Sequence, residues 1–130
     1  MSFRSAFHEW LRDQLNVPVY DARLPVRPMM PALVQRFVSG RSVLTQSNPR
    51  SLLERRIQLD LYGNDDQQLD DKGTQLLKAL DGYHGLMGTV AIGWAGLLSD
   101  IDTVPEQIKG GEVRYRRIFD FVVAYQEPRP

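Results

Sequence analysis

The chain has 130 residues, no cysteine, and 16 basic residues against 16 acidic ones, and a chain of this length builds one ordinary domain. The lack of cysteine excludes thiol chemistry, thiolate-bound zinc and disulfides, and it suits a reducing cytoplasm. The charge balance leaves no basic surplus to neutralise a row of phosphates, so we expect no sequence-specific binding to nucleic acid. We expect no membrane association either, because no apolar run approaches the roughly 20 residues of a membrane span.

The first 31 residues divide into a helix and a proline-rich segment. Apolar residues recur at helical spacing from Phe3 to Leu15, and Ser2 is placed to cap the first turn, which predicts an amphipathic helix. Residues 16–31 contain several prolines, whose fixed φ and missing N–H groups exclude a helix and a central strand. We expect this segment to run as an extended strap over the surface.

The middle of the chain predicts two strands and a second helix. Residues 32–39 have the composition of a strand, and residues 53–61 alternate between apolar and polar side chains. Apolar positions from Leu69 to Leu80 are spaced as in a helix, which Gly82 closes as a left-handed cap. Gly73 lies on the apolar stripe of this helix, which predicts a close approach to the sheet.

Residues 90–98 and 113–125 predict two further strands. The order helix, strap, strand, strand, helix, strand, strand predicts a single α+β domain over residues 1–130. Its sheet is expected to be mainly antiparallel, with four to five strands and both helices packed on one face.

The other face of the sheet is expected to be open and partly apolar, which favours a partner. Strict alternation in the third predicted strand places Trp94 and Leu98 on the core face. The apolar residues expected on the open face are Ala91, Ala95, Leu97, Ile118, Val122 and Ala124.

Two connections are longer than hairpins need, and such loops are commonly functional. They span Gly40 to Ser51 and Ser99 to Gly111, and they differ in charge, so one could meet the other across a boundary between subunits. The residues predicted to contact a partner are Arg41, Thr45, Asn48 and Arg50 in the first loop and Asp100, Asp102, Glu106 and Lys109 in the second.

The remaining polar residues predict no catalytic, metal-binding or cofactor-binding site. His8 and His84 stand in no zinc-ligand pattern and beside no evident nucleophile. The acids around Asp65 and Asp66 lack the spacing of a calcium loop and suit a helix N-terminus, where the helix dipole favours negative charge.

Arg114, Arg116 and Arg117 form the one basic run. On a strand, the first two point one way and the third the other. Glu54 or Asp60 on a neighbouring strand could neutralise part of the run, and contact with a partner is the alternative.

Several of these segments resemble the tail-completion proteins of long-tailed bacteriophages, a group similar to lambda-type tail terminators. The resemblance rests on the Arg55–Gly63 strand (RRIQLDLYG), the helix ending Leu76–Gly82, the Gly88–Val90 strand and the closing Tyr115–Tyr125 strand, and it covers almost the whole chain. Gly73 departs from it mildly, because alanine or a larger residue is expected there.

The resemblance implies an α+β subunit that forms a six-membered ring, caps the full-length tail tube and offers a surface for the head to join. It implies no cofactor. The implied partners are further copies of the chain, the tail tube protein and a head-completion or connector protein. The protein would be assembled in the cytoplasm of a bacterial host and reside in the virion, at the head-proximal end of the tail.

Two other interpretations fit the sequence. One is a head-completion or connector protein of the phage neck. The other is a small α+β enzyme or ligand-binding domain whose site has no visible motif.

Overall fold

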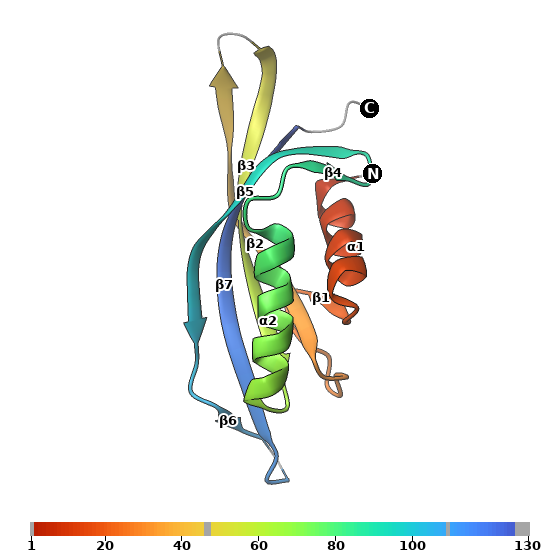
Figure 1. Cartoon of the computed structure of the whole chain (residues 1–130), viewed down its shortest axis with the longest axis vertical. Helices are drawn as coiled ribbons and strands as arrows, with labels where there is room; N and C mark the ends of the chain where they lie inside the picture. The colour runs from red at the N-terminus through yellow and green to blue at the C-terminus, as the bar shows by residue number, and fades with distance from the viewer. Residues whose placement is uncertain (1, 46–47, 109, 127–130) are drawn as a thin grey trace.

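A computed structural model describes residues 2–45, 48–108 and 110–126, with the backbone alone for those of residues 42–51 that it covers. Within these residues, two helices and seven strands follow one another along the chain (Figure 1). Their bounds are α1 Phe3–Leu15, β1 Val19–Asp21, β2 Ala32–Thr45, β3 Asn48–Gly63, α2 Asp66–Leu80, β4 Gly85–Met87, β5 Val90–Asp102, β6 Glu106–Gln107 and β7 Val113–Gln126. No helix in the described part of the chain is both long and apolar enough to cross a membrane.

The strands form one mixed sheet in the order β1-β2-β3-β7-β5-β4, and β6 pairs with β7. β1 runs parallel to β2, and the other pairs are antiparallel. The α+β class is therefore confirmed, but the prediction of four to five strands was too low. The missed strands β1, β4 and β6 have only two or three residues each, too few for an alternating pattern. β1 lies within the predicted strap, at the sheet edge where the neighbouring Pro18 is tolerated.

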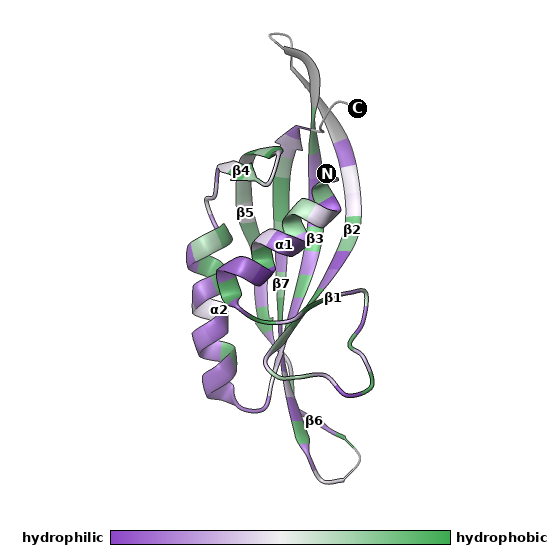
Figure 2. Ribbon diagram, turned by 90° about the vertical axis from the view of Figure 1, so that its right-hand side faces the viewer, coloured by the Kyte–Doolittle hydropathy of each residue, from purple (hydrophilic) through white to green (hydrophobic). Residues whose placement is uncertain are grey.

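Both helices cover the same face of the sheet, as expected (Figures 1 and 2). Their buried residues and those of the central strands form one apolar core, which includes Phe7, Leu59, Leu76, Phe119 and Phe121. The predicted caps are present. The Ser5 amide donates to Ser2 Oγ at 3.2 Å, the Gln68 amide donates to Asp65 Oδ1 at 2.9 Å, and Gly82 has a φ of 81°.

Gly73 brings α2 close to the sheet, as its place on the apolar stripe predicted. A Cβ atom added there would collide with Nη1 of Arg117 and would lie 3.3 Å from the Phe119 ring. Glycine at this position therefore leaves the space through which the Arg117 side chain passes beneath the helix.

A β-bulge reverses part of the predicted alternation in β5. The register against β7 shifts between Ile92 and Trp94 and again between Leu97 and Ser99. The residues from Trp94 to Leu97 therefore exchange faces, and the expected alternation returns from Ser99 onward. Ala95 is buried and Leu97 packs against the core, contrary to the prediction for both. Trp94 and Leu98, expected on the core face, are 44% and 54% exposed.

The two predicted long loops are largely strands. β2 extends to Thr45 and β3 begins at Asn48, so residues 40–45 and 48–51 belong to two paired strands, which we call the β2–β3 hairpin. Its arm reaches beyond both helices in Figure 1. β5 continues to Asp102, and β6 pairs with the start of β7. Both regions are rich in polar residues and so lack the alternation of apolar and polar side chains by which strands are predicted. Backbone pairing and ion pairs hold these strands together in place of apolar packing.

Candidate interaction surface

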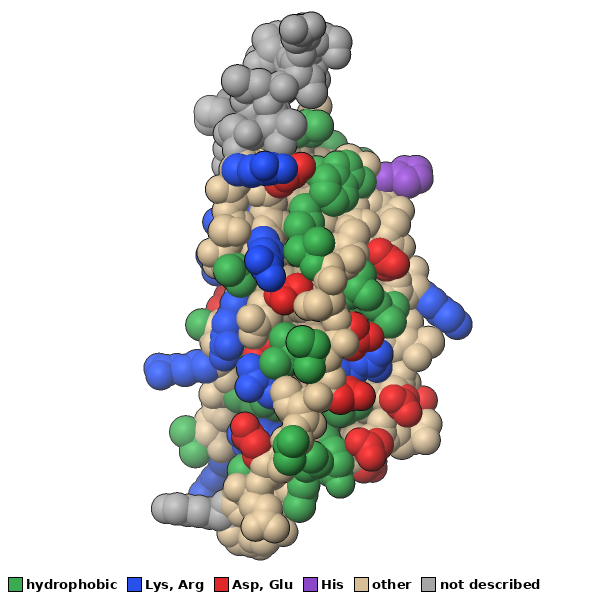
Figure 3. Space-filling view, turned by 90° about the vertical axis from the view of Figure 1, so that its left-hand side faces the viewer, with side chains coloured by type: hydrophobic (Ala, Val, Ile, Leu, Met, Phe, Trp, Pro, Cys, Tyr) green, Lys and Arg blue, Asp and Glu red, His purple; other side chains and the backbone are tan. Residues whose placement is uncertain are grey.

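The face of the sheet opposite the helices is open, and charged side chains organise its centre (Figure 3). Asp60 of β3 is fully buried there. Its carboxylate accepts a hydrogen bond from Arg116 Nη2 at 2.6 Å and one from Gln58 Nε2 at 2.8 Å, and Arg36 Nη1 lies 3.5 Å away. The predicted pairing of the basic run with Asp60 is confirmed for Arg116.

This network shifts the ionisation of two neighbouring groups. Burial is the main cause that raises the pKa of Tyr62 above its ordinary value. Burial of Arg116 opposes its charge, but the hydrogen bond and charge of Asp60 outweigh that cost and raise the pKa of Arg116. Both side chains therefore hold their protons at neutral pH.

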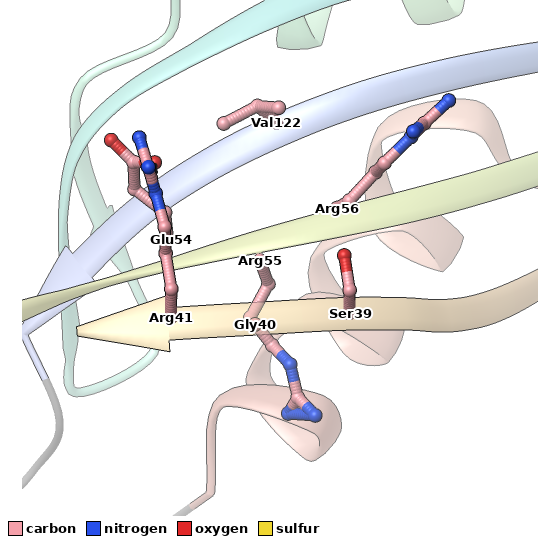
Figure 4. A pocket seen from close by; sticks show the side chains of 7 residues that line it. All are labelled: Ser39, Gly40, Arg41, Glu54, Arg55, Arg56 and Val122. Carbon is pink, nitrogen blue, oxygen red and sulfur yellow. Dashed lines mark hydrogen bonds and ion pairs between the residues drawn. The ribbon is translucent and has the colours of Figure 1, made fainter.

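Further ion pairs continue toward the β2–β3 hairpin. Arg41 Nε donates to Glu54 Oε2 at 2.8 Å. Arg56 Nη2 lies 3.5 Å from Asp120 Oδ2, which also accepts from Ser99 Oγ at 3.0 Å. Arg41, Glu54 and Arg56 point to the same side and border a cavity of about 260 Å³, with Val122 across from them (Figure 4). Asp60, Glu54 and Asp120 are thus each paired with an arginine, an arrangement that fixes this part of the surface.

An apolar stripe runs along β5 beside these charges. Trp94, Leu98 and Ile101 are 44%, 54% and 55% exposed, and Figure 3 shows hydrophobic side chains gathered along this part of the open face. Exposed apolar residues in a row, bordered by polar ones, are typical of an interaction site. The sequence predicted an apolar open face, and Ala91 is exposed there as expected. Ala95 and Leu97 were assigned to it wrongly, because the bulge cannot be located from alternation.

A solved structure described as the virion of native gene transfer agent (GTA) particle contains a chain similar to this one. The TM-score is 0.59 at 12% sequence identity, over 98% of this chain and 96% of that chain. The fold is shared with a virion component. At this identity the likeness establishes the fold alone. No protein-family model matches the sequence, and no curated protein matches it.

Charge is distributed unequally across the sheet. Residues 1–63 carry nine arginines and five acids, whereas residues 64–112 carry three lysines and nine acids, so their net charges are +4 and −6. The first segment forms β1, β2 and β3 at one side of the sheet, and the second forms α2, β4 and β5 at the other. Figure 3 shows the basic side chains gathered toward one flank and the acidic ones toward the other.

Those predicted partner-contact residues whose side chains the structure describes lie on these two flanks. Arg41 projects from β2 on the open face, and Asp100 and Asp102 lie on β5 beside Arg117. Glu106 is exposed on β6. Lys109 and the side chains of Thr45, Asn48 and Arg50 lie outside the described residues. The two groups therefore belong to opposite sides of the sheet.

The two histidines have different surroundings. His8 of α1 is half-buried, and its Nδ1 lies 3.4 Å from Nε2 of Gln35, while His84 is exposed in the turn before β4. Within the residues that the structure describes, no group of three or more His, Cys, Asp or Glu side chains could hold a metal ion.

Proposed function

We propose that this chain is a structural protein of a bacteriophage or prophage particle, and specifically a tail-completion protein of the tail-terminator type. The observation that carries the proposal is the fold, which matches a component of a gene transfer agent virion over nearly the full length of both chains. The resemblance of the Arg55–Gly63 and Tyr115–Tyr125 strands to tail terminators supports the more specific role.

In this role, copies of the chain form a ring, with six as the expected number. The ring caps the tail tube, ends its polymerisation and presents a surface to a head-completion or connector protein. The protein works by docking and not by catalysis. The unequal charge of the two flanks supports a head-to-tail ring, because such a contact joins two different patches of each subunit. We propose that the β2–β3 hairpin and the β5–β6 segment take part in these contacts.

The proposal can be tested by adding the purified chain to tube protein that is polymerising, with the tube protein taken from the same phage or prophage. We expect tubes that stop growing when the chain binds, so that their mean length falls as the chain concentration rises. Tubes of unchanged length with the chain bound along their sides would contradict the terminator role.

The exposed apolar stripe on β5 offers a matched pair of variants for the same assay. Trp94→Asp with Ile101→Asp changes the open face, whereas Val26→Asp with Met29→Asp changes exposed apolar residues of the strap. If the open face meets a virion partner, the first variant loses capping or head joining and the second retains both.

A head-completion protein of the phage neck is the second candidate, because the structural likeness is to a component of a whole virion. Such a protein would bind the isolated head connector and leave tube length unchanged. Measuring both binding reactions with one preparation of the chain separates the two roles.

A further inference from the structure

Two arginines meet at the edge of β2 without strong acidic partners. The guanidinium carbon of Arg4 lies 4.3 Å from the centre of the Phe37 ring, and that of Arg55 lies 5.2 Å from it. Arg4 Nη1 lies 4.0 Å from Oδ1 of the exposed Asp21. Arg55 forms no ion pair among the described residues. We call Arg4, Arg55 and Phe37 the basic edge cluster.

The lack of a side chain at Gly40 allows Arg55 to reach this edge. A Cβ atom at Gly40 would lie 3.3 Å from Arg55 Nε, so glycine leaves room for the side chain to cross β2. Figure 4 shows Arg55 directed to the opposite side of the sheet from its neighbours Glu54 and Arg56. Its Nε is buried and has no hydrogen-bond acceptor in the part of the chain that the structure describes.

This part of the β2 edge is also free of a neighbouring strand. β1 pairs only with Leu33, Val34 and Gln35. From Phe37 onward, no other described strand pairs with the outer edge of β2. A partner can therefore approach the basic edge cluster from the side.

The opposite flank carries an acidic edge cluster, which we define as Asp70, Asp100 and Asp102 around Arg117. Asp100 holds Arg117 through two hydrogen bonds of 2.6 and 2.7 Å, and Asp102 Oδ1 lies 3.8 Å from its Nε. The charge of Asp70 also acts on this guanidinium. One arginine faces three carboxylates, so two negative charges remain in excess, and Asp102 is 77% exposed.

We propose that the acidic edge cluster of one copy of this chain contacts the basic edge cluster of the next copy. Both clusters belong to the helix-covered side of the sheet, at opposite edges. Joining them makes a head-to-tail contact that repeats from copy to copy. The contact leaves the open face, with its apolar stripe, available to a different partner. This inference specifies the interface of the proposed ring and rests on that proposal.

The contact requires neighbouring copies to be offset along the strands. Arg55 pairs with Val123 of β7, whereas Asp102 pairs with Arg117. Six residues of an antiparallel strand span about 20 Å. Offsets of this kind arise where strands tilt relative to the axis of a closed assembly.

Charge reversal tests the contact by sedimentation velocity at low salt, with the chain alone and with purified tail tubes. We expect Arg4→Glu with Arg55→Glu to weaken self-association by about tenfold or more, since like charges then face each other. Asp70→Lys with Asp102→Lys should do the same. Combining all four changes in one chain should restore assembly, because the two edges have exchanged charge. High salt should weaken assembly of the natural chain.

Arg56→Glu is the matched control, since it makes the same charge change one residue away on the opposite face. Arg55→Glu alone should weaken assembly and Arg56→Glu should not, with both folds checked by circular dichroism. Equal effects of the two variants, failure of the fourfold exchange to restore assembly, or a natural chain that stays monomeric in both conditions would overturn the inference. Rings that form without binding tube ends would instead contradict the proposed function and leave this contact standing.

Discussion

The two faces of the sheet are stabilised by different interactions. On the helix-covered face, apolar side chains such as Phe119 and Phe121 are fully buried beneath α1 and α2. On the open face, Asp60 is equally buried but is surrounded by Arg116, Arg36 and Gln58. Packing of apolar side chains involves no charged groups. The arrangement of the open face depends instead on the ion pairs and hydrogen bonds around Asp60. The first face supplies most of the stability, and the second supplies a fixed surface that a partner can bind.

Truncating the apolar core should give the largest effect. Phe121→Ala should lower the free energy of unfolding by about 4 kcal/mol, because a fully buried ring leaves a cavity. Val122→Ala, the next residue on the open face, should cost less than about 1 kcal/mol. Urea unfolding of the two variants measures the difference. Similar losses would show that the open face carries as much of the stability as the core.

Removing the buried carboxylate of Asp60 should cause the second-largest loss in the free energy of unfolding. Asp60→Asn should lower the free energy of unfolding by about 3 kcal/mol, since Arg116 and Arg36 lose their acidic partner within the fold. Glu54→Gln removes an acid whose partner Arg41 is 76% exposed and should cost less than about 1 kcal/mol. If Asp60→Asn proved as mild as Glu54→Gln in urea unfolding, the open face would not depend on its network.

Changing the contact between α2 and the sheet should have a smaller effect on the free energy of unfolding. Gly73→Ala adds a Cβ atom that collides with Arg117, whose end is tied to Asp100, and should cost about 1 kcal/mol despite the better helix propensity. In an Arg117→Ala background the same change should stabilise by about 1 kcal/mol. A double-mutant cycle by urea unfolding measures this change of sign. Additive effects would mean that Gly73 and Arg117 do not compete for the same space.

The smallest effect on stability should come from a change at Tyr62, and it should appear only in alkaline solution. Burial raises the pKa of Tyr62 in the folded state, so the folded chain holds this proton more tightly than the unfolded chain. The stabilisation of the folded state by this proton is complete below the ordinary tyrosine pKa of about 10, and it is lost as the pH rises above that value. Tyr62→Phe should therefore reduce the loss of stability between neutral and alkaline pH, measured by thermal unfolding at several pH values. An unchanged pH profile would contradict burial as the cause.

The helix-covered face was far more predictable from the sequence than the open one. Helical spacing located α1 and α2, Ser2 and Asp65 indicated their caps, and Gly73 indicated a close approach. These signals are local or periodic. The bulge before Trp94, the β2–β3 hairpin and the crossing of Arg55 over Gly40 depend on pairing between distant segments. Periodicity within one strand carries no information about such pairing.

The candidate surface was predicted only in outline. An open, partly apolar face and two oppositely charged regions were expected, and the structure places charges of opposite sign on opposite sides of the sheet. Arg4, Arg55 and the stripe residue Ile101 were missed. The signal for Arg55 was a charged residue on the apolar face of its strand, and its meaning emerged only when Gly40 and Phe37 were seen beside it.

Electron microscopy of the purified chain mixed with tail tubes of its own phage or prophage tests the central proposal most directly. We expect a ring of identical subunits at one end of each tube and none along its sides. Binding along the walls, or tubes with both ends bare in the presence of excess folded protein, would contradict it.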